Sequence, residues 1–289
     1  MPYKNLEDKR LHDKRYVEKR KEAAGANPPF MRQLIEVKVK GPAHGLRIAV
    51  LPDMQVRPGV PLDHLKWIGQ YVAEKQPDVI VQIGDFCDMP SLSQHDAPGS
   101  VKMEGKRYKS DLECVHRAME TLTAPWHKMK KTPKMVLTLG NHEDRITRLI
   151  NRDAKLQGLI SLEDLHYKEA GWEVYPFLQP VVVGGVAFCH YFPSGAMGRP
   201  IGSAKKLLTT LHMSAFAGHQ QGRDIAYSHR ADGTDLTAII SGSCYLHAEE
   251  YMSPFTNNHW RGLYFLQEVK GGCFDEMAVS LAYLKRKFA

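Results

Sequence analysis

The sequence predicts an α/β fold built as a two-sheet sandwich. Between residues 46 and 150, apolar strand-like runs alternate with amphipathic helix-like runs, an order typical of a layered α/β domain. Beyond residue 180 the apolar runs become short, and the first two are separated by Gly184-Gly185, which indicates a hairpin. The 289 residues are 43% hydrophobic and 25% charged, which excludes a disordered chain, a collagen-like repeat and a small disulfide-stapled scaffold.

The first half of the domain is expected to alternate between strands and helices. The apolar runs have the length of buried strands, whereas the segments between them repeat with a helical period. The expected elements are a strand at 46–51, a helix at 62–75, a strand at 78–83, a helix around 111–130, a strand at 134–139 and a helix from about 143. A polar segment with Gly and Pro, residues 89–109, is expected to be either a substrate-binding flap or a solvated loop.

The second half is expected to form the second sheet. Its hairpin joins residues 181–183 to residues 186–191, and further strands are expected at 213–217, 237–241 and 262–269. Short strands and hairpins favour antiparallel pairing, so we expect a largely antiparallel second sheet.

The N-terminal segment differs in composition from the rest of the chain. Residues 1–22 contain eight Lys or Arg and five Asp or Glu with few apolar residues, so they can form a charged helix that buries little. Gly25 and Pro28 end this pattern. We therefore expect a charged arm and linker over residues 1–44 and one domain over residues 45–289. In composition alone the arm resembles the charged N-terminal helices of some phage-encoded nucleases, and a solvated surface helix is the alternative.

Other features of the chain favour a location in the cytoplasm. Nowhere do eighteen apolar residues run together, and the N-terminus lacks the apolar stretch of a signal peptide, so no membrane contact is expected. The five cysteines are widely spaced without a Cys-x-x-Cys pair, which argues against a disulfide framework and against a thiolate zinc site. For a phage-encoded chain the location would be the host cytoplasm. The sequence does not indicate an oligomeric state.

The net charge of +7 is concentrated in three segments. Residues 1–22, residues 102–109 and residues 285–287 each carry three more basic than acidic residues, so the remainder of the chain is slightly acidic. Basic segments attract polyanions such as DNA or RNA, although a charge of this size also serves solubility alone.

Polar residues able to bind metal ions follow each of five predicted strands. These residues are Asp53 and Gln55, Asp85 and Asp88, Asn141 and His142, His190, and finally His219 and Gln221. The carboxyl ends of neighbouring strands in layered α/β proteins meet along one edge, so these side chains are expected to share one crevice. Carboxylate, amide and imidazole groups are ligands of divalent cations. The sequence therefore predicts a metal site.

In order and spacing, these motifs resemble those of the calcineurin-like metallophosphoesterases. The motifs are Asp-x-Gln at 53–55, Gly-Asp-x-x-Asp at 84–88, Gly-Asn-His-Glu at 140–143, His190, and Gly-His-x-Gln at 218–221. The resemblance covers roughly residues 46–245 and implies a four-layer α/β/β/α sandwich with two divalent metal ions. Such a centre hydrolyses phosphate esters by attack of a hydroxide that bridges the two ions.

The resemblance also implies a role for each matching residue. Asp85 would bridge both ions. The residues that would bind only the first ion are Asp53, Gln55 and Gln221, and those that would bind only the second are Asn141, His190 and His219. His142 would be the general acid or contact the phosphate, with Asp88 orienting it. Arg145, just after the third motif, is expected either to bind the substrate phosphate or to pair with a neighbour on an exposed helix.

Two positions depart from the family pattern. Most members have His where this chain has Gln55 and Gln221, and both positions belong to the first ion. A Gln carbonyl is a neutral, hard oxygen ligand, so we expect this site to favour Mn²⁺ or Mg²⁺ over Zn²⁺. Mn²⁺ is the favoured cofactor, with Mg²⁺, Zn²⁺ or Fe as alternatives. The Asp-x-Gln motif also resembles the manganese-dependent ADP-ribose and CDP-alcohol diphosphatase branch.

These observations leave three functions open. The favoured one is a phosphodiesterase or nuclease acting on DNA or RNA, because of the basic segments. A small-molecule phosphatase or nucleotide diphosphatase is the alternative, because of the Asp-x-Gln motif. A non-catalytic binding module with a degenerate metal site is the third, supported only by the two Gln.

Overall fold

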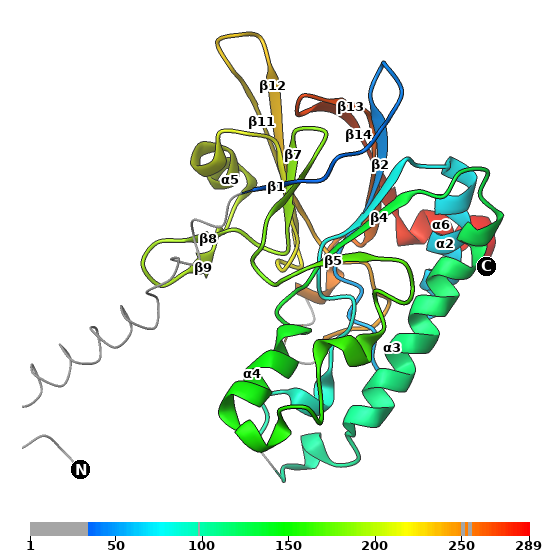
Figure 1. Cartoon of the computed structure of the whole chain (residues 1–289), viewed down its shortest axis with the longest axis vertical. Helices are drawn as coiled ribbons and strands as arrows, with labels where there is room; N and C mark the ends of the chain where they lie inside the picture. The colour runs from blue at the N-terminus through cyan, green and yellow to red at the C-terminus, as the bar shows by residue number, and fades with distance from the viewer. Residues whose placement is uncertain (1–33, 98, 250–251, 254–255) are drawn as a thin grey trace, which may run out of the picture. The chain divides into compact units, whose positions relative to one another are not determined.

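The computed structural model describes residues 34–289, except for 98, 250–251 and 254–255 (Figure 1). The charged helix predicted over residues 1–22 lies outside the described residues. Contacts divide the chain into residues 1–34 and residues 35–289, and the described strands and helices all belong to the second unit. Strand β1 (Ile35–Glu36) comes from the segment predicted to be a linker and pairs in parallel with β6 (Val181–Val183).

The first sheet contains the three strands predicted in the first half of the domain. Its strand order is β14-β13-β2-β3-β4-β5. The strands are β2 (Leu46–Leu51), β3 (Val79–Gln82), β4 (Lys134–Thr138), β5 (Glu173–Tyr175), β13 (Gly262–Lys270) and β14 (Cys273–Ser280). Strands β2 to β5 pair in parallel, so the residues that follow β2, β3 and β4 emerge at the same edge of the sheet.

The second sheet has the strand order β1-β6-β7-β10-β12-β11. Its remaining strands are β7 (Val186–Cys189), β10 (Ala215–Ala217), β11 (Arg223–His229) and β12 (Asp235–Ser241). The predicted hairpin is present as antiparallel β6 and β7. The prediction of a largely antiparallel sheet is wrong, because β10 pairs in parallel with both β7 and β12. Helix α5 (Ala204–Leu211) makes the crossover that a parallel β7–β10 pair requires.

The strand at 262–269 is predicted to lie in the second sheet, but in the structure it belongs to the first sheet. It forms β13, which pairs antiparallel with β2 and with β14. Its first five residues are all buried, so β13 lies inside the first sheet, with β14 as the edge strand. A strand that is buried on both faces can lie inside either sheet of the sandwich. The apolar pattern of residues 262–269 therefore does not indicate which sheet they join.

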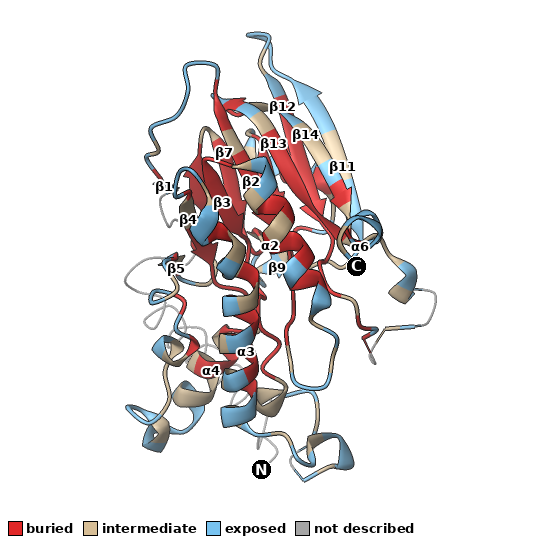
Figure 2. Cartoon of the chain, turned by 90° about the vertical axis from the view of Figure 1, so that its right-hand side faces the viewer, coloured by how far each residue is buried: buried red, intermediate tan, exposed pale blue. Residues whose placement is uncertain are grey.

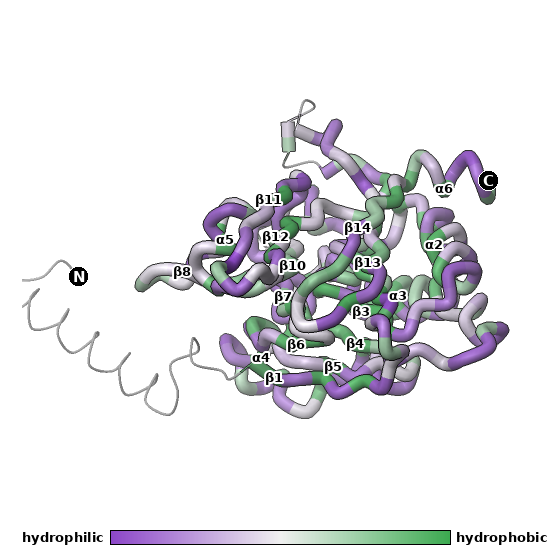
Figure 3. The backbone as a smooth tube through the Cα atoms, turned by 90° about the horizontal axis from the view of Figure 1, so that it is seen from above, coloured by the Kyte–Doolittle hydropathy of each residue, from purple (hydrophilic) through white to green (hydrophobic). Residues whose placement is uncertain are grey.

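Three apolar clusters separate four layers of structure (Figures 2 and 3). Helices α2 (Asp63–Lys75), α3 (Tyr108–Thr123) and α6 (Leu281–Phe288) cover the outer face of the first sheet, and α5 covers the outer face of the second. Alternation in β2 follows from this arrangement: Ala49 and Leu51 face the helices, whereas Ile48 and Val50 face the second sheet. The predicted four-layer α/β/β/α sandwich is therefore confirmed.

The remaining described elements are short and lie mostly in the connections. The helix predicted around 111–130 begins earlier and ends at Thr123, where a 3₁₀ turn over Ala124–Lys128 follows. The other elements are helix α4 (Asp144–Arg152), strands β8 (Pro193–Ser194) and β9 (Arg199–Pro200), and 3₁₀ turns at Pro90–Leu92, Val101–Met103, Ala154–Leu156, Leu162–Leu165 and Thr256–Asn258. Among the helices of the described residues, none is both long and apolar enough to cross a membrane.

Candidate metal centre

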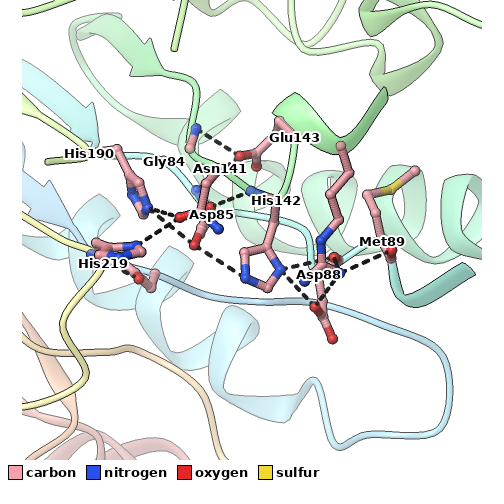
Figure 4. Close-up of polar contacts among 12 residues, drawn as sticks. Gly84, Asp85, Asp88, Met89, Asn141, His142, Glu143, His190 and His219 are labelled. Carbon is pink, nitrogen blue, oxygen red and sulfur yellow. Dashed lines mark hydrogen bonds and ion pairs between the residues drawn. The ribbon is translucent and has the colours of Figure 1, made fainter. Parts of the chain in front are cut away.

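Side chains that follow β3, β4, β7 and β10 lie together (Figure 4). Ligand atoms of Asp85, His190 and His219 all lie within 4.8 Å of one another. The side-chain oxygen Asn141 Oδ1 lies 2.9 Å from His190 Nε2 and 2.7 Å from His219 Nδ1. The carboxylate of Asp53 joins the cluster by accepting the backbone N–H of His219 at 3.1 Å. The structure thus brings these five predicted site residues together.

The backbone bends sharply at three of the predicted ligands. Gln55, Asp85 and His219 have φ angles of 43°, 51° and 66°, a left-handed conformation that costs residues other than Gly energy. The backbone N–H of Gln55 donates to the Asp85 carbonyl at 2.9 Å, which joins the loops after β2 and β3. Strain of this kind persists where surrounding contacts hold it, and it commonly marks functional sites.

The atoms in this cluster fit a shared cation. His190 Nδ1 lies 3.1 Å from the Ile83 carbonyl oxygen, which can only accept, so Nδ1 carries a proton. In the neutral ring, Nε2 is then an acceptor that faces Asp85 Oδ2 at 3.2 Å and the Asn141 oxygen. Burial alone would lower the pKa of His190, yet the charge of Asp85 raises it to about 9. These buried hydrogen-bond acceptors are therefore stable only beside a positive charge, which divalent ions would supply.

The residues predicted for the first ion also fit a cation. Burial raises the pKa of Asp53 to about 7; the charge of His190 opposes this shift and that of Asp85 adds to it. The side-chain oxygen Gln55 Oε1 is buried without a hydrogen-bond partner among the described residues. A buried, unsatisfied carbonyl oxygen is costly unless something binds it. Gln221 is half-buried and accepts a hydrogen bond from the Tyr245 hydroxyl at 2.8 Å, so its role as a ligand stays a prediction.

His142 and Asp88 form a hydrogen-bonded pair beside this cluster (Figure 4). Asp88 Oδ1 lies 2.7 Å from His142 Nδ1, and His142 Nε2 lies 3.7 Å from Asp85 Oδ2. Burial alone would raise the pKa of Asp88, but its hydrogen bond and attraction to His142 and the charge of Arg145 hold it well below the usual range. The ring therefore stays oriented with Nε2 toward the cluster.

Arg145 is buried, and its contacts differ from those of an exposed helix residue. Its Nη1 donates to the carbonyl oxygens of Asp88 at 2.7 Å and of Met89 at 3.2 Å, and lies 3.2 Å from Asp88 Oδ1. The alternative prediction, that Arg145 pairs with a neighbour on an exposed helix, is therefore wrong, because the residue is buried. A direct contact with substrate phosphate stays a prediction for Arg145.

Glu143 supports the cluster, a role that only the structure reveals. The side chain is fully buried and accepts backbone N–H groups of Asp85 at 3.0 Å, Gly140 at 2.8 Å and Cys87 at 3.2 Å, together with the Tyr167 hydroxyl. One carboxylate thus joins the loops after β3 and β4. An acidic residue inside the Gly-Asn-His-Glu motif was the available signal, but only the fold shows which backbone groups it holds.

Gly140 lies against the predicted bridging residue, and replacing it with Ala is expected to damage the site. A Cβ at Gly140 would lie 2.1 Å from Asp85 Oδ1 and 2.3 Å from Asp85 N, so the Asp85 loop would have to move. We expect Gly140→Ala to weaken Mn²⁺ binding by about 10- to 100-fold in calorimetric titration. Gly202→Ala is the matched control, since a Cβ there meets nothing within 4 Å. Wild-type affinity in Gly140→Ala would contradict the close packing described.

Comparison with known families identifies the chain. A model of the calcineurin-like phosphoesterase family matches residues 46–260, more than half of its length. The chain belongs to this family. It is therefore a hydrolase that acts on phosphate esters with divalent metal ions, and the family implies a binuclear centre. None of the curated proteins compared with the chain matches it.

Solved structures similar to this phosphoesterase include two phosphatases. A dimetal phosphatase from Danio rerio has 11% sequence identity and a TM-score of 0.37, over 82% of this chain and 99% of that one. A purple acid phosphatase from yellow lupin (Lupinus luteus) seeds has 11% identity and a TM-score of 0.29, over 85% of this chain and 56% of that one. The family assignment rests on the family model alone.

Replacing Gln55 by His in this phosphoesterase is expected to change its metal preference. An imidazole nitrogen suits Zn²⁺ better than an amide oxygen does, and residue 55 is buried beside the cluster. We expect Gln55→His to shift the ratio of Zn²⁺ to Mn²⁺ affinity by about tenfold without abolishing turnover. Competition titrations with both ions measure this ratio, and Gln157→His at an exposed position is the control. An unchanged ratio would remove Gln55 from the ligand set.

Proposed function

We propose that this phosphoesterase cleaves phosphodiester bonds in nucleic acid at a binuclear centre that favours Mn²⁺. The observation that carries the catalytic part is the buried cluster in which His190 Nε2 and the oxygens of Asp85 and Asn141 face one another. Asp85 would hold both ions, because only an anion with two oxygens serves two cations well. The other proposed ligands are Asp53, Gln55 and Gln221 for the first ion and Asn141, His190 and His219 for the second.

His142 is the proposed general acid. The two ions, when bound, would neutralise the phosphate and supply the attacking hydroxide. His142 Nδ1 is bonded to Asp88, so its Nε2 is the nitrogen free to protonate the departing oxygen. Burial alone would lower the pKa of His142, but the charge of Asp85 and the hydrogen bond to Asp88 raise it.

The open side of the cluster supports access for a large substrate. Asn141, His142 and His219 are half-buried, whereas Asp53 and Asp85 are buried. The cluster therefore faces solvent on the side of His142, where the leaving group would depart.

Unpaired cations in the segment that follows Asp88 support a polyanionic substrate. Within residues 102–109, Lys106 pairs with Asp96 and Lys109 pairs with Glu113. Lys102 and Arg107 are exposed, and the structure gives neither a carboxylate partner among the described residues. The segment that carries them, residues 89–109, follows directly on Asp88 and is anchored by the Ser91 N–H bonded to Asp111 at 3.0 Å. Such cations bind phosphate groups of a strand outside the cleaved bond.

A substrate panel with Mn²⁺ tests this proposal. We expect cleavage of single- or double-stranded DNA or of RNA, weakened by added salt. The double variant Lys102→Ser/Arg107→Ser should lower cleavage and reduce the slope of log affinity against log salt by about 1 to 2. Lys128→Ser/Lys130→Ser is the matched control, since these exposed lysines precede β4 and lie at the opposite end of that strand from the centre.

Turnover restricted to mononucleotides, nucleotide diphosphates or sugar phosphates would overturn the nucleic-acid substrate. It would favour the alternative, a small-molecule phosphatase or nucleotide diphosphatase, which the Asp-x-Gln motif at 53–55 supports. The cytoplasmic location and phage origin stay predictions of the sequence.

A further inference from the structure

A chain of charged groups connects the proposed general acid to a distant part of the sequence. Asp88 binds His142 through Oδ1, and its other oxygen, Oδ2, accepts a hydrogen bond from Arg57 Nη1 at 2.6 Å. The same nitrogen lies 3.1 Å from Glu249 Oε2. One guanidinium nitrogen is therefore shared by two carboxylates, one beside the centre and one in the segment after β12.

Glu249 is itself fixed on its other sides. Its Oε1 lies 2.7 Å from His247 Nε2, its backbone N–H donates to Asn257 Oδ1 at 2.8 Å, and its carbonyl accepts from Asn257 Nδ2 at 2.9 Å. The Glu249 side chain is 4% exposed and that of Asp88 is 8% exposed. A second carboxylate held this firmly would repel Asp88 unless a cation stood between them, and Arg57 is that cation.

The shared cation fixes the rotation of the Asp88 side chain. Arg145 contacts Asp88 Oδ1 and the backbone carbonyl, so Oδ2 depends on Arg57. If Oδ2 lost its partner, the carboxylate would gain freedom to turn away from the imidazole. His142 would then lose the contact that orients Nε2 toward the cluster.

We propose that Arg57 and Glu249 are positioning residues for His142, since together they hold Asp88 with Oδ1 on the imidazole and so align Nε2 with the leaving oxygen. The inference rests on the proposed role of His142 as general acid. It assigns a role to two residues that are 192 positions apart in the sequence and whose side chains meet beside Asp88.

Dependence on the leaving group separates positioning of a general acid from a structural role. A nitrophenolate leaves without needing a proton, whereas an alkoxide needs one. Loss of general acid alignment therefore slows hydrolysis of an alkyl ester far more than that of a 4-nitrophenyl ester. A general loss of structure slows both equally.

The experiment compares kcat on 4-nitrophenyl and unactivated alkyl esters, either diesters or monoesters according to which the wild type hydrolyses. For Arg57→Met, kcat on the alkyl ester should fall about 10- to 100-fold and kcat on the 4-nitrophenyl ester by less than about threefold. Arg57→Lys should recover part of the loss, since a single nitrogen makes both contacts. Glu249→Gln should show the same selective loss to a smaller extent.

The tautomer of His142 and a control variant at Arg47 provide two further measurements. In metal-free protein, long-range ¹H–¹⁵N spectra should show His142 protonated at Nδ1 in the wild type and a mixture of tautomers in Arg57→Met. Arg47→Met is the matched control, because Arg47 pairs with buried Asp78 at the opposite end of β2 and β3. Its ratio of the two kcat values should equal that of the wild type.

The reference variant His142→Ala makes the outcomes distinct. If His142→Ala selectively loses the alkyl ester but Arg57→Met and Glu249→Gln do not, the positioning role is overturned and the general acid stands. If His142→Ala slows both esters equally, the general acid assignment fails and the positioning role fails with it. Should Arg57→Met not fold, Glu249→Gln, which keeps the volume of the side chain, decides: an equal loss on both esters overturns the inference.

Discussion

Asp85→Asn is expected to abolish hydrolysis and the binding of both metal ions. The asparagine oxygen can still accept the His142 backbone N–H that Asp85 Oδ1 accepts at 2.9 Å, so the loop keeps its main contact. The side chain loses the charge and the second oxygen that would serve two cations. We expect kcat/KM to fall by about 10³-fold or more, because several kcal/mol of transition-state stabilisation depends on the ions.

Metal analysis and activity measured on the same preparation test this expectation. Asp78→Asn is the control, since Asp78 is also a buried aspartate beside the first sheet but pairs with Arg47 and Lys131. That variant should keep its metal content and its turnover per folded molecule. An Asp85→Asn protein that hydrolyses at the wild-type rate would refute the assignment of the centre.

His142→Ala is expected to separate metal binding from proton transfer. The backbone N–H of residue 142 remains to hold Asp85, so the metal content should be unchanged. Hydrolysis of an unactivated ester should fall by about 10²- to 10⁴-fold, the usual contribution of a general acid. His116→Ala is the control, because His116 lies on α3 and binds the Asp164 carbonyl oxygen. Loss of both ions in His142→Ala, or full activity, would count against a proton-transfer role.

The inner strands and the clustering of the proposed site residues could be predicted because both depend on simple repeating patterns. β2 and β3 are short runs of buried residues, and a polar residue after each is conspicuous. Parallel strands place their carboxyl ends together, which is why Asp53, Asp85 and Asn141, which follow β2, β3 and β4, could be grouped without a structure.

The edge strands and the sheet membership could not be predicted in the same way. β11 and β14 are largely exposed or half-buried, so their sequences resemble those of loops. The parallel pairing of β7 with β10 depends on the crossover through α5, a short helix whose pattern did not stand out. Registers and crossovers are properties of the whole chain, and local periodicity does not contain them.

The supporting contacts of the site were also beyond the sequence. Arg57 and Glu249 are 192 positions apart, and nothing in the sequence near either residue indicates that they share a contact. The position of Arg145 after the third motif predicts a contact with substrate, yet its Nη1 is bonded to Asp88 and Met89. Short motifs identify side chains by chemical type, whereas packing decides which atoms each one meets.

Anomalous X-ray diffraction at the manganese edge, on crystals grown with Mn²⁺, tests the central claim most directly. Two peaks are expected, about 3.5–4 Å apart, on either side of the Asp85 carboxylate. One peak should lie against Asp53 and Gln55, and the other against Asn141 and His190. A single peak, or peaks that do not contact Asp85, would contradict the binuclear centre proposed for this phosphoesterase.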